Sequence, residues 1–168
     1  MFAIGEHVIH PGQGVCTVMG FRDDTPAPMI DLYAKSGHSE TRILYPLAQQ
    51  DRLHAAISPE AAEDLLARYD QLETDPFTER NSNLEETYFK KRIHLGAPET
   101  MRVAKTMRER IHDAQRRGKK PSSYYNRVLK EARRRSIEEL AVVLDRSEQD
   151  IERCIDDAAS RAFAAAEN

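Results

Sequence analysis

GEHVIHPGQGVCTV, residues 5–18, contains two short runs of apolar and β-branched residues that are separated by Pro11-Gly12. Such a tight turn leaves no room for a crossover helix, so the two runs predict antiparallel strands. Punctuation by Gly and Pro continues beyond them, with a second tight turn at Ser36-Gly37. We therefore expect strands at residues 6–10, 14–21, 28–34 and 41–45, which form a small twisted antiparallel barrel or half-barrel.

After these strands the apolar residues recur at helical spacing. Ser58-Pro59-Glu60 is typical of a helix start, and we expect this helix to close the barrel. The polar stretch 75–82 contains Pro76 and is expected to be a linker between residues 1–75 and residues 76–168. Helix starts at Asn83, Pro98, Ser122 or Ser123, and Ser147 predict a compact all-α bundle in the second part. The expected fold class is α+β with two domains.

The amino-acid composition and the missing motifs reduce the number of function classes that fit this chain. With 40% hydrophobic and 32% charged residues the chain is expected to be soluble, and no apolar run approaches the ~20 residues of a membrane span. Two distant cysteines fit a reducing cytoplasm better than a disulfide framework. The six histidines form no metal-like cluster, and no nucleophile, metalloprotease or dinucleotide motif is present, so we expect neither an enzyme nor a cofactor, metal or small-molecule substrate.

The net charge of -3 hides an uneven distribution of charge. Residues 1–82 carry 6 Lys or Arg against 13 Asp or Glu, and residues 136–168 carry 3 against 9. Residues 90–135 carry 16 against 4, a net +12. A block of this kind is typical of a surface that binds nucleic acid, although the same count also describes a merely solvated basic face.

The stretch 5–18 resembles the start of the RNA polymerase interaction domain that CarD/CdnL-type bacterial transcription regulators share with the transcription-repair coupling factor. The order of a small barrel, a helix, a linker and a helical domain is also similar, whereas the phosphate loop of a helicase is absent, which favours the stand-alone regulator. The resemblance implies an SH3/Tudor-like barrel that binds the RNA polymerase β subunit through an exposed edge strand, with Arg42 and Leu44 as contacts. Leu44 stands where relatives often have a basic residue.

The resemblance also implies that the helical domain contacts promoter DNA near the transcription bubble. Relatives have a Trp wedge at the start of the first helix of this domain; this chain has no Trp, and alignment on Tyr88 puts Leu84 there. Leucine can also wedge between base steps, with less stacking area. Basic residues at helix ends and on one helix face complete the expected DNA surface: Lys90, Lys91, Arg92, Lys119, Lys120, Arg127, Lys130, Arg133 and Arg134.

Arg127, Lys130 and Arg134 stand at i, i+3 and i+7, a stripe suited to a row of phosphates. No helix carries Asn, Gln and Arg at base-reading spacing, so the expected contacts are to the DNA backbone and largely independent of sequence.

Other interpretations remain open. The edges of the barrel could be covered by its own loops. The helical domain could dock on protein, which would make the chain a protein-only adaptor; Leu84 in place of Trp and the acidic last third favour this alternative. An RNA-binding barrel is disfavoured by the acidic N-terminal half.

Overall fold

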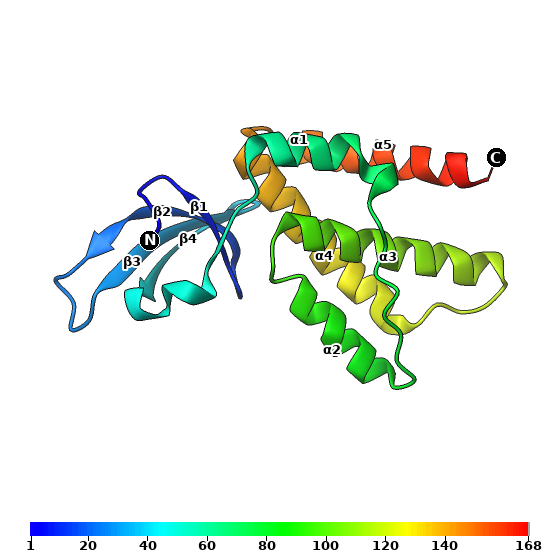
Figure 1. Cartoon of the computed structure of the whole chain (residues 1–168), viewed down its shortest axis with the longest axis horizontal. Helices are drawn as coiled ribbons and strands as arrows, with labels where there is room; N and C mark the ends of the chain where they lie inside the picture. Colours follow the sequence, from blue (N-terminus) through cyan, green and yellow to red (C-terminus); the bar gives the residue numbers. More distant parts are fainter. Residues whose placement is uncertain (168) are drawn as a thin grey trace. The chain divides into compact units, whose positions relative to one another are not determined.

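Figure 1 shows the computed structural model, which describes residues 1–167: strands come first along the chain and helices follow. Contacts divide the chain into two units, of which the first is Met1–Ala56 and the second begins at Ile57. The fold class is α+β, as predicted. The division lies before α1, whereas the sequence led us to expect a boundary at residue 75.

The first unit is a five-stranded antiparallel sheet with the strand order β4-β3-β2-β1-β5. The strands are β1 (His7–His10), β2 (Gly14–Arg22), β3 (Met29–Ser36), β4 (Ser39–Pro46) and β5 (His54–Ala55), and the 3-10 helix η1 (Leu47–Arg52) precedes β5. The four predicted strands are confirmed, and β5 was not predicted. Of the two forms expected, a barrel or a half-barrel, the closed barrel is not formed: among the described residues 1–167, β4 pairs with β3 alone and the two-residue strand β5 with β1 alone.

Alternation along the strands builds the core of the sheet unit. Val8, Val18, Ile30 and Leu32 are fully buried on one face. Cys16 lies among them, and burial raises the pKa of its thiol to about 11, so this thiol is a packing group.

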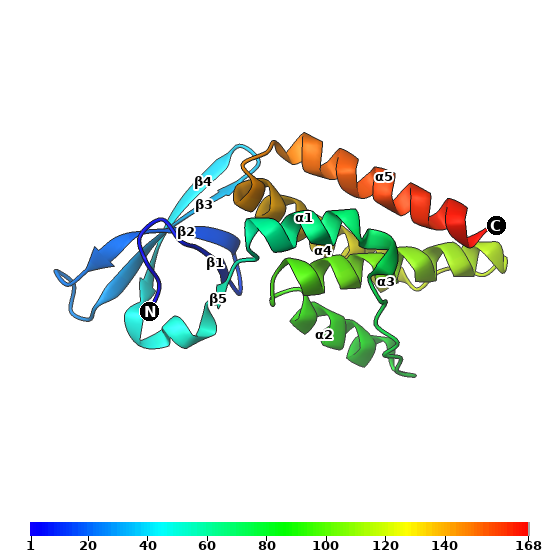
Figure 2. The ribbon, with the colours of Figure 1, turned by 45° about the horizontal axis from the view of Figure 1, so that its top comes forward.

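As far as the structure describes it, from residue 57 to residue 167, the second unit contains five α-helices. They are α1 (Pro59–Ala67), α2 (Ser82–Arg92), α3 (Ala97–Arg116), α4 (Ser123–Leu144) and α5 (Glu148–Ala166), with the short 3-10 helix η2 (Tyr69–Gln71) after α1. Figure 2 shows α3 running beside α4, and these two helices make the main helix contact of the unit. Ser58 and Ser147 cap their helices through the side chain. The cap of α2 is Asn81, two residues before the predicted Asn83.

The helix α1 belongs to the helical unit, which corrects the expectation that it closes the sheet. Ala62 and Leu66 share a buried cluster with Met101 of α3, Leu140 of α4 and Ile151 of α5. The apolar face of α1 is therefore covered by the other helices of the unit.

The segment from Tyr69 to Phe77, which includes the first residues of the linker predicted at 75–82, is docked onto α3. Lys105 donates to the carbonyl oxygens of Tyr69, Asp70 and Leu72 at 2.9, 3.2 and 2.7 Å. Arg110 donates to the carbonyl oxygens of Asp75 and Phe77, at 3.1 and 2.6 Å. Cations of α3 thus bind backbone carbonyl oxygens of η2 and of the irregular segment that follows it.

Within residues 1–167, no helix combines the length and the apolar composition needed to cross a bilayer.

Candidate functional site

The strand β4 forms one edge of the sheet and exposes backbone hydrogen-bonding groups. The N–H of Leu47 donates to the carbonyl of Pro28 at 3.0 Å, one step beyond the β3–β4 ladder. Hydrogen-bonded pairs alternate in an antiparallel ladder, so the odd-numbered residues of β4 bond to β3. The N–H groups of Glu40, Arg42 and Leu44 consequently point away from the sheet.

Both predicted polymerase contacts lie on this edge. The Arg42 side chain is 67% exposed and pairs with Asp31 of β3, with 3.2 Å between Nη2 and Oδ2. Leu44 is 44% exposed and lies directly opposite Asp31 in the register. Beside them Tyr33 hydrogen-bonds to Glu40, which raises the pKa of the tyrosine hydroxyl. Met19 lies at a bulge in β2 and is 45% exposed. Together with Tyr33, Glu40 and Arg42 it lines a shallow depression. The edge is therefore a mixed apolar and charged surface.

Leu84 lies in the first turn of α2 and is 57% exposed. Thr87 and Lys91, which are also exposed, follow at i+3 and i+7 on the same face. The opposite face is buried and carries Phe89 and two carboxylates, Glu85 and Glu86. The structure thus places Leu84 in solvent, as a wedge residue requires.

Glu85 anchors α2 to the bundle. It accepts hydrogen bonds from the hydroxyl of Tyr124, from Arg110 Nη1 at 3.1 Å and from the backbone N–H of Glu79 at 2.8 Å. Burial, and then the bond to Glu85, raise the pKa of Tyr124. Sequence reasoning missed this cluster because Tyr124 stands 39 positions from the Glu85 that it contacts.

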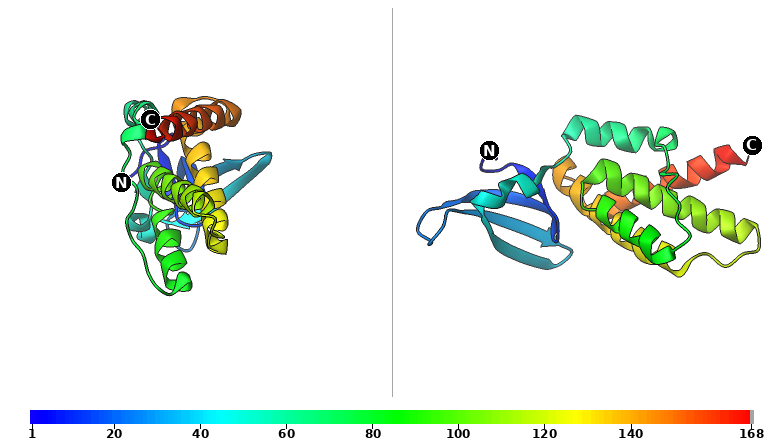
Figure 3. Two further views of the ribbon diagram at one scale, coloured as in Figure 1. Left: turned by 90° about the vertical axis from the view of Figure 1, so that its right-hand side faces the viewer. Right: turned by 60° about the horizontal axis from the view of Figure 1, so that its bottom comes forward.

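Glu86 holds two of the predicted DNA contacts. Its Oε1 lies 2.9 Å from Lys90 Nζ, and its Oε2 lies 3.1 Å from Arg127 Nη2 of α4. Lys90 first, and then Arg127, hold the pKa of Glu86 below its ordinary value. The structure therefore brings Lys90 and Arg127 together across one carboxylate. Figure 3 gives two further views of the helical unit, in which α2 lies along the first part of α4.

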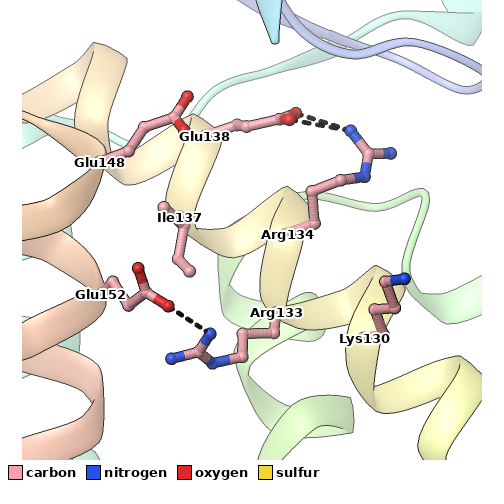
Figure 4. A pocket seen from close by; sticks show the side chains of 7 residues that line it. All are labelled: Lys130, Arg133, Arg134, Ile137, Glu138, Glu148 and Glu152. Atoms are coloured by element: carbon pink, nitrogen blue, oxygen red, sulfur yellow. Dashed lines mark hydrogen bonds and ion pairs between the residues drawn. The ribbon is translucent and has the colours of Figure 1, made fainter. Parts of the chain in front are cut away.

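The arginines farther along α4 are also engaged by carboxylates. Arg134 reaches Glu131 at 2.7 Å and Glu138 at 2.9 Å, and Glu131, then Glu138, raise its pKa further. Arg133 pairs with Glu152 at 2.8 Å and with Asp156 at 2.7 Å, both on α5. Figure 4 shows the Arg134–Glu138 and Arg133–Glu152 pairs beside Lys130 in a cleft of about 280 Å³. The predicted stripe on α4 is thus mostly neutralised.

Four of the predicted contacts keep a free charge. In the part of the chain that the structure describes, no ion pair forms at the ammonium groups of four exposed lysines: Lys91, Lys119, Lys120 and Lys130. Arg92 instead donates to the hydroxyl of Tyr88 at 3.2 Å and lies over its ring, with 5.2 Å between Cζ and the centroid. The net +12 of the basic block therefore overstates the free positive surface.

Between residues 1 and 167, no group of three His, Cys, Asp or Glu side chains is arranged to hold a metal ion.

No model of a known protein family matches this chain, and no curated protein matches it.

Proposed function

We propose that this chain is a bacterial transcription regulator of the CarD/CdnL type. In this proposal the sheet unit is an SH3/Tudor-like module that binds the RNA polymerase β subunit, and the helical unit contacts promoter DNA and modulates the stability of the open complex. A cytoplasmic location belongs to the same proposal. The polymerase β subunit is proposed as the partner because residues 5–18 resemble the RNA polymerase interaction domain of that family.

The observation that carries the proposal is the open edge of β4. An added strand can pair with the outward N–H groups of Glu40, Arg42 and Leu44, and main-chain pairing supplies affinity whatever the side chains. Arg42 and Leu44 are exposed and can adjust the choice of partner. This edge is eight residues long, which suits it to strand addition.

Contact with DNA is supported by the free lysines and by the exposed Leu84. Four ammonium groups suffice for weak, sequence-independent binding to phosphates, with a dissociation constant on the order of 10⁻⁴ to 10⁻⁶ M. Tethering to polymerase raises the local DNA concentration toward the ~mM range, where so weak a site becomes occupied. A wedge at Leu84 would then act only at the promoter.

A protein-only adaptor is the second candidate, and the ion pairs of Lys90, Arg127 and Arg134 favour it. A salt titration of DNA binding separates the two functions. Phosphate contacts give a steep loss of affinity with salt, whereas an adaptor gives no binding to titrate.

Capture of the β subunit by the full chain tests the sheet edge. Leu44→Pro removes one outward N–H and leaves the β3–β4 ladder intact, so we expect it to abolish capture. Leu44→Ala is the matched control, because it keeps the N–H and should retain most of the binding. Thermal denaturation verifies that both variants fold. Capture by Leu44→Pro at the wild-type level would refute strand addition at β4.

A further inference from the structure

The environment of Glu86 differs from that of its two cations. The side chain of Glu86 is only 11% exposed, whereas the side chains of Lys90 and Arg127 are 57% and 59% exposed. The carboxylate is thus fixed at the α2–α4 contact, and both cationic groups also face solvent. A phosphate could approach them from the solvent side.

A carboxylate and a phosphate compete for the same partners. Both present oxygens that accept hydrogen bonds from guanidinium and ammonium groups. In this structure Glu86 already engages both cations: it accepts a hydrogen bond from Arg127 at 3.1 Å and forms an ion pair with Lys90 at 2.9 Å. The three side chains together carry a net charge of +1, where the two cations alone would carry +2.

We propose that Glu86 is a built-in competitor of DNA phosphate, which holds Lys90 and Arg127 and thereby keeps the affinity of the helical unit for DNA low. This inference rests on the proposed contact with DNA. A low affinity for DNA makes promoter binding depend on polymerase, because a regulator that binds DNA weakly by itself is directed to promoters by its polymerase tether. Loss of the competitor makes the chain a stronger and less selective DNA binder.

Binding of the full chain to a fluorescent DNA duplex of mixed sequence, measured over a series of salt concentrations, tests the inference. Each additional phosphate contact steepens the slope of log K against log salt by about 0.9, which is roughly eightfold in affinity near 0.1 M salt. Glu86→Gln keeps the size of the side chain and releases one or two cations. We expect binding to tighten roughly eightfold or more and the slope to steepen by about one to two.

Two controls separate release of the cations from the loss of one negative charge. Glu109→Gln makes the same chemical change at an exposed carboxylate of α3 that has no ion-pair partner among residues 1–167. It should change the affinity much less. Arg127→Gln should have little effect when Glu86 is present, and should remove most of the gain when it is combined with Glu86→Gln. Circular dichroism verifies that α2 remains helical in each variant.

Equal affinities for Glu86→Gln and Glu109→Gln, in a chain that does bind DNA with a salt slope, would overturn the competitor and leave the proposed function standing. So would a large loss on Arg127→Gln alone, a comparison that does not depend on the folding of Glu86→Gln. An absence of DNA binding by the wild-type chain and by every variant would overturn both.

Discussion

Substitution of Leu84 distinguishes most clearly between a residue that wedges into DNA and a residue that only stabilises the fold. Full burial of a leucine side chain contributes about 1.5–3 kcal/mol, and Leu84 is 57% exposed, so less than half of that contribution is present. We expect Leu84→Ala to lower the free energy of unfolding by about 1 kcal/mol or less. If Leu84 inserts between base steps, the same substitution shortens the lifetime of the open complex.

The control lies on the opposite face of the same helix. Phe89 is fully buried against Met107 and Val128, and Phe89→Ala should cost about 3–5 kcal/mol. Urea unfolding of both variants at one pH gives the two free energies, and decay of polymerase–promoter complexes after addition of a competitor gives the lifetimes. The wedge hypothesis requires a small change in stability together with a large change in lifetime for Leu84→Ala.

The substitution Leu84→Trp provides a second, independent test of the wedge hypothesis. A larger aromatic surface gains stacking on an exposed base step, so this variant should prolong the open complex. Two results would refute the reasoning: a cost of about 2 kcal/mol or more for Leu84→Ala, which would make the residue part of the core, or unchanged lifetimes in both the Ala and the Trp variants, which would leave Leu84 without a role at the bubble.

Two further predictions concern buried charges. Lys105 is 6% exposed, and Lys105→Met removes the ammonium donor of three carbonyl oxygens, of which that of Tyr69 keeps the N–H of Leu72. We expect a loss of about 2–3 kcal/mol in urea unfolding and faster proteolysis between Leu72 and Phe77, whereas unchanged proteolysis would contradict docking by Lys105. Burial raises the pKa of Glu139, which accepts the N–H of Ile57 at 3.1 Å. The folded state therefore holds this proton more tightly than the unfolded state, so the contribution of Glu139 to stability is present below the ordinary carboxyl pKa and is lost as the pH rises through the raised one. Glu139→Gln should match the wild type in acid and exceed it at neutral pH, and a variant that is less stable at neutral pH would contradict this sign.

The strands were predictable because their cause is local. Pro11-Gly12 and Ser36-Gly37 leave no room for anything but tight turns, and the alternation of Val8, Ile30 and Leu32 shows which face is buried. Whether the sheet closes into a barrel was not predictable, because closure depends on how many residues of the last strand pair with a neighbouring strand. Here β5 contributes two residues, and its partner is β1.

The position of α1 illustrates a different limit. Its sequence shows an apolar face through Ala62 and Leu66, and the same face fits a sheet or a helix bundle. Only the tertiary structure shows that Met101 and Leu140 are its partners. Proximity in sequence to the strands was therefore a poor guide to proximity in space.

The basic segment shows why a charge count differs from a charged surface. The pairs Glu86–Lys90 and Arg134–Glu138 stand at i, i+4 and could have been foreseen from the sequence. Arg127–Glu86 and Arg133–Asp156 join different helices, and nothing local predicts them.

In the helical unit, arginines mostly form ion pairs and hydrogen bonds within the fold, whereas several exposed lysines face solvent. The arginine fork can span several acceptors: Arg133 and Arg134 each bridge two carboxylates, and Arg110 bridges Glu85 and two backbone carbonyl oxygens. Four exposed lysines instead form no ion pair with any residue from 1 to 167, and they are compact, strongly hydrated charges on flexible stems. Such lysines suit contacts with phosphates whose positions vary along DNA, whereas the arginines hold the scaffold rigid. Affinity for DNA in this chain should therefore depend on its lysines and on the occupancy of Arg127 by Glu86, more than on the number of basic residues between 90 and 135.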